Sequence, residues 1–401
     1  MQLPFVEPDL PRLHLSTSRT QRAVHHVAGI FAGIGGLEEG FRQAGHEATV
    51  LCEIDASART VLSAKFPTII QHDDVRTLHD LPSPTTILAA GFPCQDLSQA
   101  GQTIGISGNR SGLVDEVFRL ISCNRVPWVV LENVPFMLQL GRGEAMEHIV
   151  SEFERLDYKW AYRIVNSTSF GLPQRRRRVY FVASKRHDPR TILFADEFGE
   201  PISTKQSKAQ VAHGFYWTEG VRGLGWAVDA VPTIKGGSGL GIPSSPAVVF
   251  SDGRVGTIDI RDAERLQGFP ADWTIESEKI SKRGTRWKLI GNAITVHAAR
   301  WLGDRFANPG QPLVFGTHPL LRGAKWPTAA WNVGDGRVKV VASEWPVQLE
   351  RASLEQFLSF PSPALSARAT SGFLKRTERA KLRFPEGFIA TLRAHLDVVQ
   401  R

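Results

Sequence analysis

Cysteine is scarce in this sequence: Cys52, Cys94 and Cys123 are the only three among 401 residues. Three cysteines at irregular spacing exclude a disulfide framework and a cysteine-based metal site, and they favour a reducing, cytoplasmic setting. Long apolar runs are also missing, because no stretch approaches the roughly 18 residues that a membrane span needs. Residues 1–24 are too polar for the apolar segment of a signal peptide, so we expect a loose N-terminal arm.

Acidic residues are outnumbered by basic ones. The chain has 48 Lys and Arg against 40 Asp and Glu, a formal net charge of +8. Residues 306–401 alone hold 13 basic and 7 acidic side chains, which accounts for +6 of that charge. A basic excess concentrated in one part of the chain favours a polyanionic partner, although a solvated basic surface is an equally simple interpretation.

The chain from about 25 to 185 alternates between apolar strand patterns and helical patterns. His25–Phe31 is a short apolar run, and Ala48–Ile54 is a second one. Between them lies a helical pattern whose apolar residues recur at i, i+4 and i+7: Leu37, Phe41 and Ala44. Alternation of this kind predicts an α/β fold with a doubly wound, mostly parallel sheet.

The turn Gly33-Ile34-Gly35-Gly36 joins the first strand to that helix. Glu53 follows Gly33 by 20 residues, the interval at which an acid after the second strand meets ribose hydroxyls in nucleotide-binding units. Glu38 takes the place of the third glycine of the dinucleotide motif, so the pattern favours an adenosine-type ligand without a pyrophosphate clamp. A plain tight turn is the alternative. Asp74, which follows a further strand pattern, would accept from an adenine amino group or cap a helix.

Two reactive side chains follow two buried-strand patterns. Thr86–Ala90 leads into Gly91-Phe92-Pro93-Cys94-Gln95, and Trp128–Leu131 leads into Glu132. Because ligands bind outside the carboxyl ends of strands in an open α/β sheet, we expect both groups at one site. A thiolate beside a carboxylic acid suits an electron-poor heteroaromatic ring, since sulfur can add to a ring carbon while the acid protonates a ring nitrogen. An inert buried thiol is the alternative for a lone cysteine.

Four consecutive arginines, Arg175 to Arg178, follow Gln174 and precede an apolar strand pattern. Strand alternation predicts that Arg176 and Arg178 share one face and that Arg175 and Arg177 share the other. The first pair would point into the crevice, and the second pair is better suited to phosphates. A solvated basic cluster is the ordinary alternative.

Six segments, in order, resemble the signature blocks of the C5-cytosine-specific DNA methyltransferase family of bacterial restriction-modification systems. They are Phe31–Leu37, Gly91–Gln95, Glu132–Val134, Gln174–Arg178, Arg265–Pro270 and Gly291–Ala293. The resemblance spans about 25–305 and implies a Rossmann-like methyltransferase sheet. It also implies S-adenosylmethionine as the methyl donor and a cytosine flipped out of duplex DNA as the substrate. A monomer on DNA and a paired restriction endonuclease are further implications.

The resemblance assigns roles residue by residue. Cys94 resembles the nucleophile that attacks cytosine C6, and Glu132 resembles the acid that binds and protonates N3. Arg178 resembles the residue on the cytosine O2, supported by Arg176. The positions that match cofactor contacts are Phe31, Gly33, Gly35, Gly36, Glu53, Asp74, Pro93, Asn292 and Val296. The positions that match DNA contacts are Gln95, Ser98, Gln174, Arg175 and Arg177, and no metal is implied.

The resemblance also divides the chain into domains. Residues 25–185, completed by 286–305, match the catalytic domain. Residues 186–285 match a smaller, mostly β target recognition domain, in agreement with short β-like runs between 247 and 258. Residues 95–112 are rich in small and polar types, and we expect them to form a lid over the site.

Residues 306–401 form a C-terminal extension that the smallest family members lack. Leu374–Arg383 predicts a short basic helix within it. Three roles are open for the extension: extra DNA contact, packing on the small domain, or a partner-binding surface. For the whole chain, tRNA cytosine methylation and a catalytically silent DNA-binding regulator are the alternatives to a DNA methyltransferase.

Overall fold

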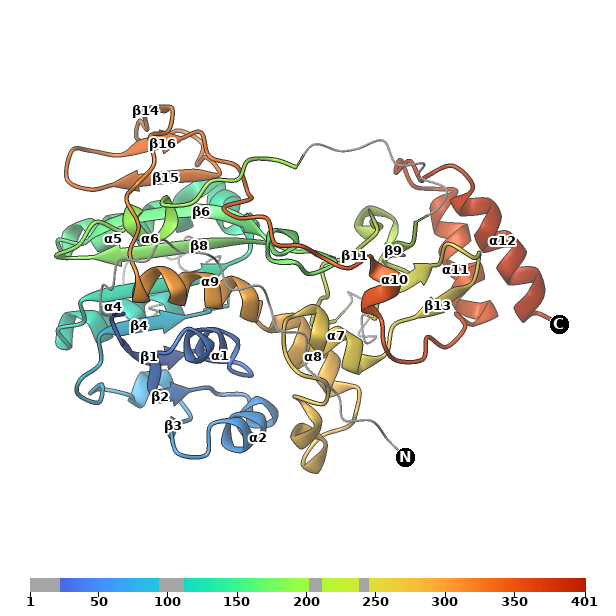
Figure 1. Ribbon diagram of the computed structural model, residues 1–401, viewed down its shortest axis with the longest axis horizontal. Helices are drawn as coiled ribbons and strands as arrows, with labels where there is room; N and C mark the ends of the chain where they lie inside the picture. The colour runs from blue at the N-terminus through green and yellow to red at the C-terminus, as the bar shows by residue number, and fades with distance from the viewer. Residues whose placement is uncertain (1–21, 94–111, 202–210, 238–244) are drawn as a thin grey trace, which may run out of the picture.

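A ten-stranded sheet organises the larger part of the molecule (Figure 1). The computed structural model describes residues 22–93, 112–201, 211–237 and 245–401. Five neighbouring strands are parallel, in the spatial order β3 (Ile70–His72), β2 (Glu47–Cys52), β1 (His26–Ile30), β4 (Ile87–Ala90) and β5 (Trp128–Asn133). Strand order reverses between β1 and β4, which places a crevice at their carboxyl ends. The doubly wound sheet predicted from the alternation is confirmed.

Antiparallel strands continue the sheet beyond β5. The next two are β8 (Arg177–Ser184) and β6 (Lys159–Asn166), and β8 runs antiparallel to both of its neighbours. Three strands from the C-terminal extension complete this edge: β15 (Ala329–Asn332), β16 (Val338–Val340) and β14 (Thr317–Pro319). The first part of the extension therefore belongs to the large sheet.

Helices cover both faces of the large sheet (Figure 1). α1 (Gly36–Gln43), α9 (Val296–Ala307) and the short α6 (Arg190–Leu193) pack on the face that Val27 and Val130 present. α4 (Leu113–Cys123) and α5 (Glu144–Arg155) pack on the face of Ala28 and Val129. These adjacent strand residues point to opposite faces, as the two-residue period of a strand requires. None of the helices in the described ranges has the length and apolar character needed to cross a membrane.

Short elements connect these layers. α2 (Ala56–Lys65) begins at Asp55, whose side chain accepts from the backbone N–H groups of Ser57 and Ala58. Its apolar face packs against Trp273 and Leu289 from much later in the chain. The 3-10 helices described in this part of the chain are η1 (Val75–Thr77), η2 (Pro135–Gly143) and η3 (Ser167–Phe170). β7 (Gln174–Arg175) pairs in parallel with β11 (Val231–Pro232) and joins the large sheet to the smaller unit.

The smaller unit is built on a four-stranded antiparallel sheet. Its order is β10 (Trp226–Val228), β9 (His213–Phe215), β12 (Ala247–Val249) and β13 (Val255–Thr257). The helices that follow are η5 (Val221–Gly223) within the β9–β10 connection, and then α7 (Ile260–Leu266), η6 (Ile275–Lys279) and α8 (Thr285–Asn292). The β-like runs expected near 250 are the β12–β13 hairpin. Residues 192–194 are buried against the large sheet. By packing, the boundary between the large and the smaller unit therefore lies after residue 194 and not at the expected residue 186.

The end of the C-terminal extension covers this four-stranded sheet (Figure 1). α10 (Leu354–Phe357), α11 (Ala367–Thr377) and α12 (Phe388–Val399) follow one another there. Phe373, Phe388 and Leu392 are buried against Phe215 and Val249 of the sheet. The packing role considered for the extension is therefore present in the structure.

The helix predicted at Leu374–Arg383 is wrong in its bounds. α11 starts after Ser366, whose hydroxyl caps the N–H of Ala369, and it ends at Thr377. Phe373 and Leu374 are its last buried apolar residues. Residues 378–383 contribute no apolar side chain to the cluster on the sheet, and basic residues alone do not hold a further helical turn.

Candidate active site

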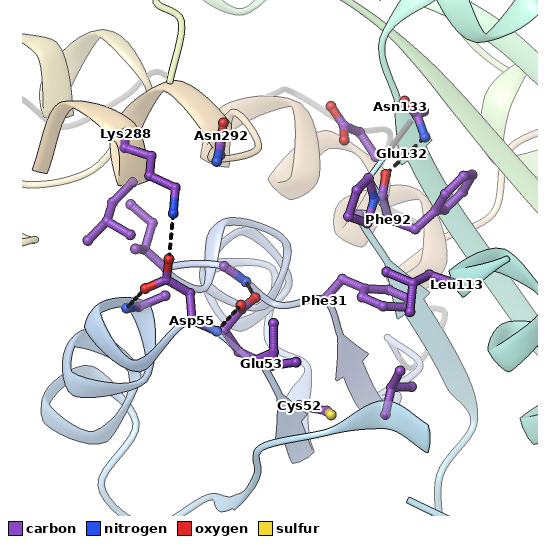
Figure 2. Close-up of a pocket in the computed structure, with 18 of the residues that line it drawn as sticks. Phe31, Cys52, Glu53, Asp55, Phe92, Leu113, Glu132, Asn133, Lys288 and Asn292 are labelled. Atoms are coloured by element: carbon purple, nitrogen blue, oxygen red, sulfur yellow. Dashed lines mark hydrogen bonds and ion pairs between the residues drawn. The ribbon is translucent and has the colours of Figure 1, made fainter. Parts of the chain in front are cut away.

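A cavity of about 500 Å³ opens at the carboxyl ends of β1 to β5, where the reversal of strand order predicts a ligand site. One wall comes from the strand ends, and the opposite wall comes from the last turn of α8. Figure 2 shows Glu132 and Asn133 on one side of this cavity and Asp55 and Lys288 on the other. The cavity therefore joins the region of the glycine turn to the region of Glu132.

The glycine turn and Glu53 are held together. Phe31 and Gly33 have φ values of 54° and 56°, so the backbone turns through the left-handed region directly after β1. A Cβ at Gly33 would meet no atom within 4 Å, which leaves room for a ligand beside the backbone. The N–H of Gly33 donates to Glu53 Oε2 at 2.7 Å, and the N–H of Asp55 donates to Oε1 at 2.8 Å. Burial raises the pKa of Glu53, and these two hydrogen bonds oppose that rise.

Acidic groups gather at this end of the cavity. Asp73 and Asp74 line it together with Glu53 and Asp55. Asp74 also caps η1 by accepting from the N–H of Arg76 at 3.0 Å, so the capping alternative is present alongside the cavity position. Lys288 from α8 reaches across and pairs with Asp55 at 2.8 Å, as Figure 2 shows.

Glu132 lies at the other end, near the end of β5. Burial raises the pKa of this carboxyl against the opposing effects of Arg178 and Arg176. Arg178 Nε is 2.8 Å from Glu132 Oε1, close enough for an ion pair. The two atoms are not aligned for a hydrogen bond, and within the described residues Oε1 has no hydrogen-bond partner. Glu132 also lines the cavity, so its carboxyl group borders the space that a ligand would occupy.

Asn133 fixes the segment that precedes Cys94. Its amide donates to the carbonyl of Phe92 at 3.0 Å, and its side-chain oxygen accepts from the N–H of Val134 at 2.8 Å. Gly91, Phe92 and Pro93 line the cavity as β4 ends. The chain therefore reaches the rim of the site at Pro93.

Residues 26–209 and 190–308 match the C-5 cytosine-specific DNA methylase family. The Type II methyltransferase M2.BsuMI of Bacillus subtilis (strain 168) is 47% identical over 379 residues, which cover 91% of this chain and 97% of that protein. The chain belongs to the C-5 cytosine-specific DNA methylase family. The sequence resemblance and the prediction of a DNA cytosine-5 methyltransferase are thus confirmed.

More distant relatives share the match over less of the chain. The Type II methyltransferase M.DsaV of Dactylococcopsis salina is 25% identical over 312 residues, 69% of this chain and 84% of that protein. The crystal structure of S. pombe Dnmt2 methyltransferase aligns with a TM-score of 0.49 at 15% identity, covering 69% of this chain and 97% of that one.

The expected cofactor positions of this methyltransferase separate into two groups. Six of them line the cavity: Phe31, Gly33, Glu53, Asp74, Pro93 and Asn292. Gly35, Gly36 and Val296 do not line it, and their expected place among the cofactor contacts stays a prediction. A Cβ at Gly35 would lie 2.5 Å from the Phe66 ring, and one at Gly36 would lie 2.4 Å from the carbonyl of Ile294. Val296 is 0% exposed in the core at the start of α9. These residues allow α1 to pack closely against α2 and the α8–α9 connection.

The alternation of the arginines is confirmed, since Arg176 and Arg178 are buried while Arg175 and Arg177 are exposed. Arg178 lines the cavity, but Arg176 does not. The Arg176 guanidinium donates to the carbonyls of Ile234, Gly291 and Ala293 at 2.9, 3.1 and 2.6 Å. Burial lowers its pKa to about 9. Arg176 therefore ties the segment after β11 to the end of α8, and its expected part in catalysis stays a prediction.

The expected DNA contacts also separate. Gln174 is 0% exposed, and its amide bonds the carbonyl of Leu266 at 2.8 Å and the N–H of Ile234 at 2.9 Å. These contacts enclose the Gln174 side chain, and its expected DNA contact stays a prediction. Arg177 pairs with Glu344 from the C-terminal extension. Arg175 is exposed and has no ion pair within the described ranges, so it alone of these three is free for a phosphate.

Several expected residues lie outside the described ranges: Cys94, Gln95, Ser98 and the proposed lid up to residue 111. The other cysteines are described. Burial raises the pKa of Cys52 to about 12, and Cys123 is exposed at the end of α4. Neither is in a setting that activates a thiol.

Sequence reasoning missed other residues that line the cavity, among them Ile54, Asp55, Leu113 and Lys288. The available signal was proximity to a motif: Ile54 and Asp55 follow Glu53, and Lys288 lies one helical turn before Asn292. Residue type gave no indication for Leu113, which reaches the cavity from the first turn of α4.

Glu38, in α1, is a buried carboxyl whose raised pKa makes the stability of the fold depend on pH. Its carboxyl lies against Gly29 of β1, where an added Cβ would come within 2.0 Å of Oε1. Burial raises its pKa from 4.5 to about 7. The native carboxyl thus keeps its proton to about pH 7, whereas the unfolded chain loses it near 4.5, so stability should fall as pH rises between these values.

We expect Glu38→Gln to remove this pH dependence. The variant should gain stability relative to the wild type between pH 5 and pH 8, by at most about 3 kcal/mol. Urea unfolding of both proteins at the two pH values measures the difference. If the free energies of unfolding of the wild type and the variant differ by the same amount at pH 5 and pH 8, Glu38 does not titrate in this range.

Proposed function

We propose that this methyltransferase transfers a methyl group from S-adenosylmethionine to C5 of a cytosine flipped out of duplex DNA, within one short recognition sequence. The observation that carries the proposal is the single cavity with a nucleoside-type cradle at the Glu53 end and a buried carboxyl at the Glu132 end. Such an arrangement can hold a methyl donor and a base side by side.

The cofactor end fits S-adenosylmethionine on three grounds. Glu53 is fixed by two backbone N–H groups, and its remaining lone pairs can accept from ribose hydroxyls. The open space beside Gly33 admits a ligand close to the backbone. Neighbouring carboxylates suit a ligand that carries a positive sulfonium group. When bound, the cofactor would supply the methyl carbon to C5 of the base.

The chain's own residues prepare the base. Cys94 sulfur forms a bond to C6, and Glu132 gives its proton to N3, so the ring remains neutral and C5 becomes enamine-like. Burial raises the pKa of Glu132, which favours the protonated carboxyl that this step needs. Arg178, which lies beside Glu132, would bind the O2 atom of the base. After C5 is methylated, its proton passes to a base, the Cys94 sulfur departs, and the N3 proton returns to the Glu132 carboxylate, which restores the C5–C6 double bond of a neutral ring.

Similarity to named proteins supports a place in restriction and modification. The Bacillus subtilis relative is a Type II methyltransferase, and this chain covers 97% of it. We infer that the protein is the modification enzyme of such a system, acts on duplex DNA as a monomer and has a cognate restriction endonuclease. The four-stranded sheet and its loops would form the target recognition domain, as the expected division of the chain requires.

Bisulfite sequencing of DNA from cells that express the chain tests the proposed function. We expect protected cytosines within one fixed sequence context, and none in cells carrying an empty vector. Parallel incubation of purified protein with labelled S-adenosylmethionine and either plasmid DNA or tRNA separates a DNA enzyme from an RNA enzyme. Label in tRNA alone, or no label in either, would contradict the proposal.

Glu53→Gln tests the cofactor cradle. The substitution keeps the shape but weakens the acceptor, and hydrogen bonds to a charged group contribute about 1.5–3 kcal/mol. We expect S-adenosylmethionine affinity to fall by about tenfold or more in calorimetry. Affinity for DNA alone should not change, because Glu53 lies at the far end of the cavity from Glu132. An unaltered cofactor affinity would remove Glu53 from the ribose role.

A further inference from the structure

The connection between α11 and α12 is strongly basic. Residues 375–383 contain five basic side chains and one acidic one. Lys375, Arg379, Lys381 and Arg383 are exposed. Within the described part of the chain, these four side chains form no ion pair, in contrast to most arginines nearer the large sheet. We call residues 375–383 the basic segment.

Contacts with the four-stranded sheet and its β9–β10 connection hold the basic segment in place. The Arg376 guanidinium donates to the carbonyl of Trp217, and the indole N–H of Trp226 donates to the carbonyl of Arg383 at 2.9 Å. Both tryptophans belong to the stretch that runs from the end of β9 through the start of β10. Phe373 and Phe388, on either side of the segment, are buried against the same sheet. The charges are therefore carried on a fixed backbone.

The same β9–β10 connection contacts the segment that follows β11, which in turn contacts β7. The Tyr216 hydroxyl donates to the carbonyl of Thr233 at 2.6 Å, and the Thr233 hydroxyl donates to the carbonyl of Arg175 at 2.8 Å. Lys235 Nζ lies 4.2 Å from the centre of the Tyr216 ring. A continuous set of contacts thus joins Arg175 of β7 to the basic segment.

We propose that the basic segment binds backbone phosphates of duplex DNA on one flank of the target base. This inference rests on the proposed function and adds a contact surface supplied by the C-terminal extension. A long polyanion accounts for the observations better than a compact acidic protein, because the free cations lie on the domain that also borders the cavity. Phosphate contacts of this kind strengthen binding and position the duplex without reading its sequence.

A triple variant tests the proposal: Arg379→Gln, Lys381→Gln and Arg383→Gln. The matched control replaces Arg322, Lys325 and Lys339 with glutamine, which removes the same charge from exposed positions around β14–β16. That edge lies at the opposite end of the molecule in Figure 1. The probe is a 40-base-pair duplex of mixed sequence, and the dissociation constant is measured without cofactor at several salt concentrations.

We expect the triple variant to bind more weakly and with a flatter dependence of log K on log salt, by about 0.9 for each phosphate that the variant no longer neutralises. The control should keep the wild-type slope, and both proteins should melt as the wild type does. A folded triple variant with the wild-type slope would overturn the proposal and leave an acidic protein as the partner to seek.

The outcome is independent of the proposed function, because binding is measured without methyl transfer. A flattened slope in a protein that methylates no cytosine would support the surface while refuting the activity. Methylation by the wild type together with an unchanged slope in the triple variant would support the activity while refuting the phosphate-binding surface.

Discussion

Replacing Cys94 with serine is expected to reduce methyl transfer to background while leaving cofactor and DNA affinity nearly unchanged. A cysteine thiol has a pKa near 8.5 and can supply a thiolate, whereas a serine hydroxyl loses its proton only at far higher pH. β4 brings the chain to the rim of the cavity at Pro93, and Asn133 fixes the preceding carbonyl. Incorporation of labelled methyl groups into plasmid DNA measures the loss.

Cys123→Ser is the matched control for this experiment, because Cys123 is exposed at the end of α4 and lies outside the cavity. It should retain full activity. A second measurement addresses the covalent step directly. A target cytosine with fluorine at C5 cannot lose a proton there, so the wild type should remain attached to the DNA under denaturing conditions. Appreciable turnover by Cys94→Ser, or attachment of that variant to the fluorinated DNA, would exclude Cys94 as the nucleophile.

Removal of residues 354–401 is expected to unfold the small domain. Phe373, Leu374, Phe388 and Leu392 are buried on the four-stranded sheet, and each buried side chain of this size contributes about 1.5–3 kcal/mol. Their combined loss is comparable with the whole stability of an ordinary domain, about 5–15 kcal/mol. The truncated chain should aggregate or melt at least about 10 °C below the full chain in thermal scans.

A point variant keeps this prediction testable if the truncated chain is insoluble. Phe373 is 0% exposed, so Phe373→Ala should destabilise the protein by about 3–5 kcal/mol. Leu382 is 37% exposed on the connection between α11 and α12, and Leu382→Ala should have little effect. A truncated protein that is monomeric and melts with the full chain would show that the helices are not part of the domain core.

Sequence patterns predicted the parts of the site that depend on strand geometry. Topology requires parallel strands to end at one edge, so the approach of the Pro93 end to Glu132 could be foreseen. The two-residue period likewise separated Arg176 and Arg178 from Arg175 and Arg177. Membership of a motif, by contrast, does not reveal which way a side chain faces. Gln174 and Val296 lie within or beside motif blocks, yet packing encloses both of them.

The C-terminal extension was harder to interpret because its strands are only three or four residues long. A run of that length has too few periods to identify a strand, and β15 is defined by its pairing with β6, which lies more than 160 residues earlier. The basic composition of Leu374–Arg383 suggested a helix, but the apolar contacts of Phe373 decide where α11 ends.

The covering of the four-stranded sheet by the last helices has a consequence for biosynthesis. β13 ends at Thr257, whereas Leu392, which completes the core beneath the helices, is made about 135 residues later. At about 5–20 residues per second, on the order of ten seconds separate the two events on the ribosome. The large sheet can therefore assemble while the four-stranded sheet still exposes its apolar face. If the four-stranded sheet reads the DNA sequence as proposed, exchange of specificity between relatives would likewise require residues 211–257 and 354–399 to be transplanted as a pair.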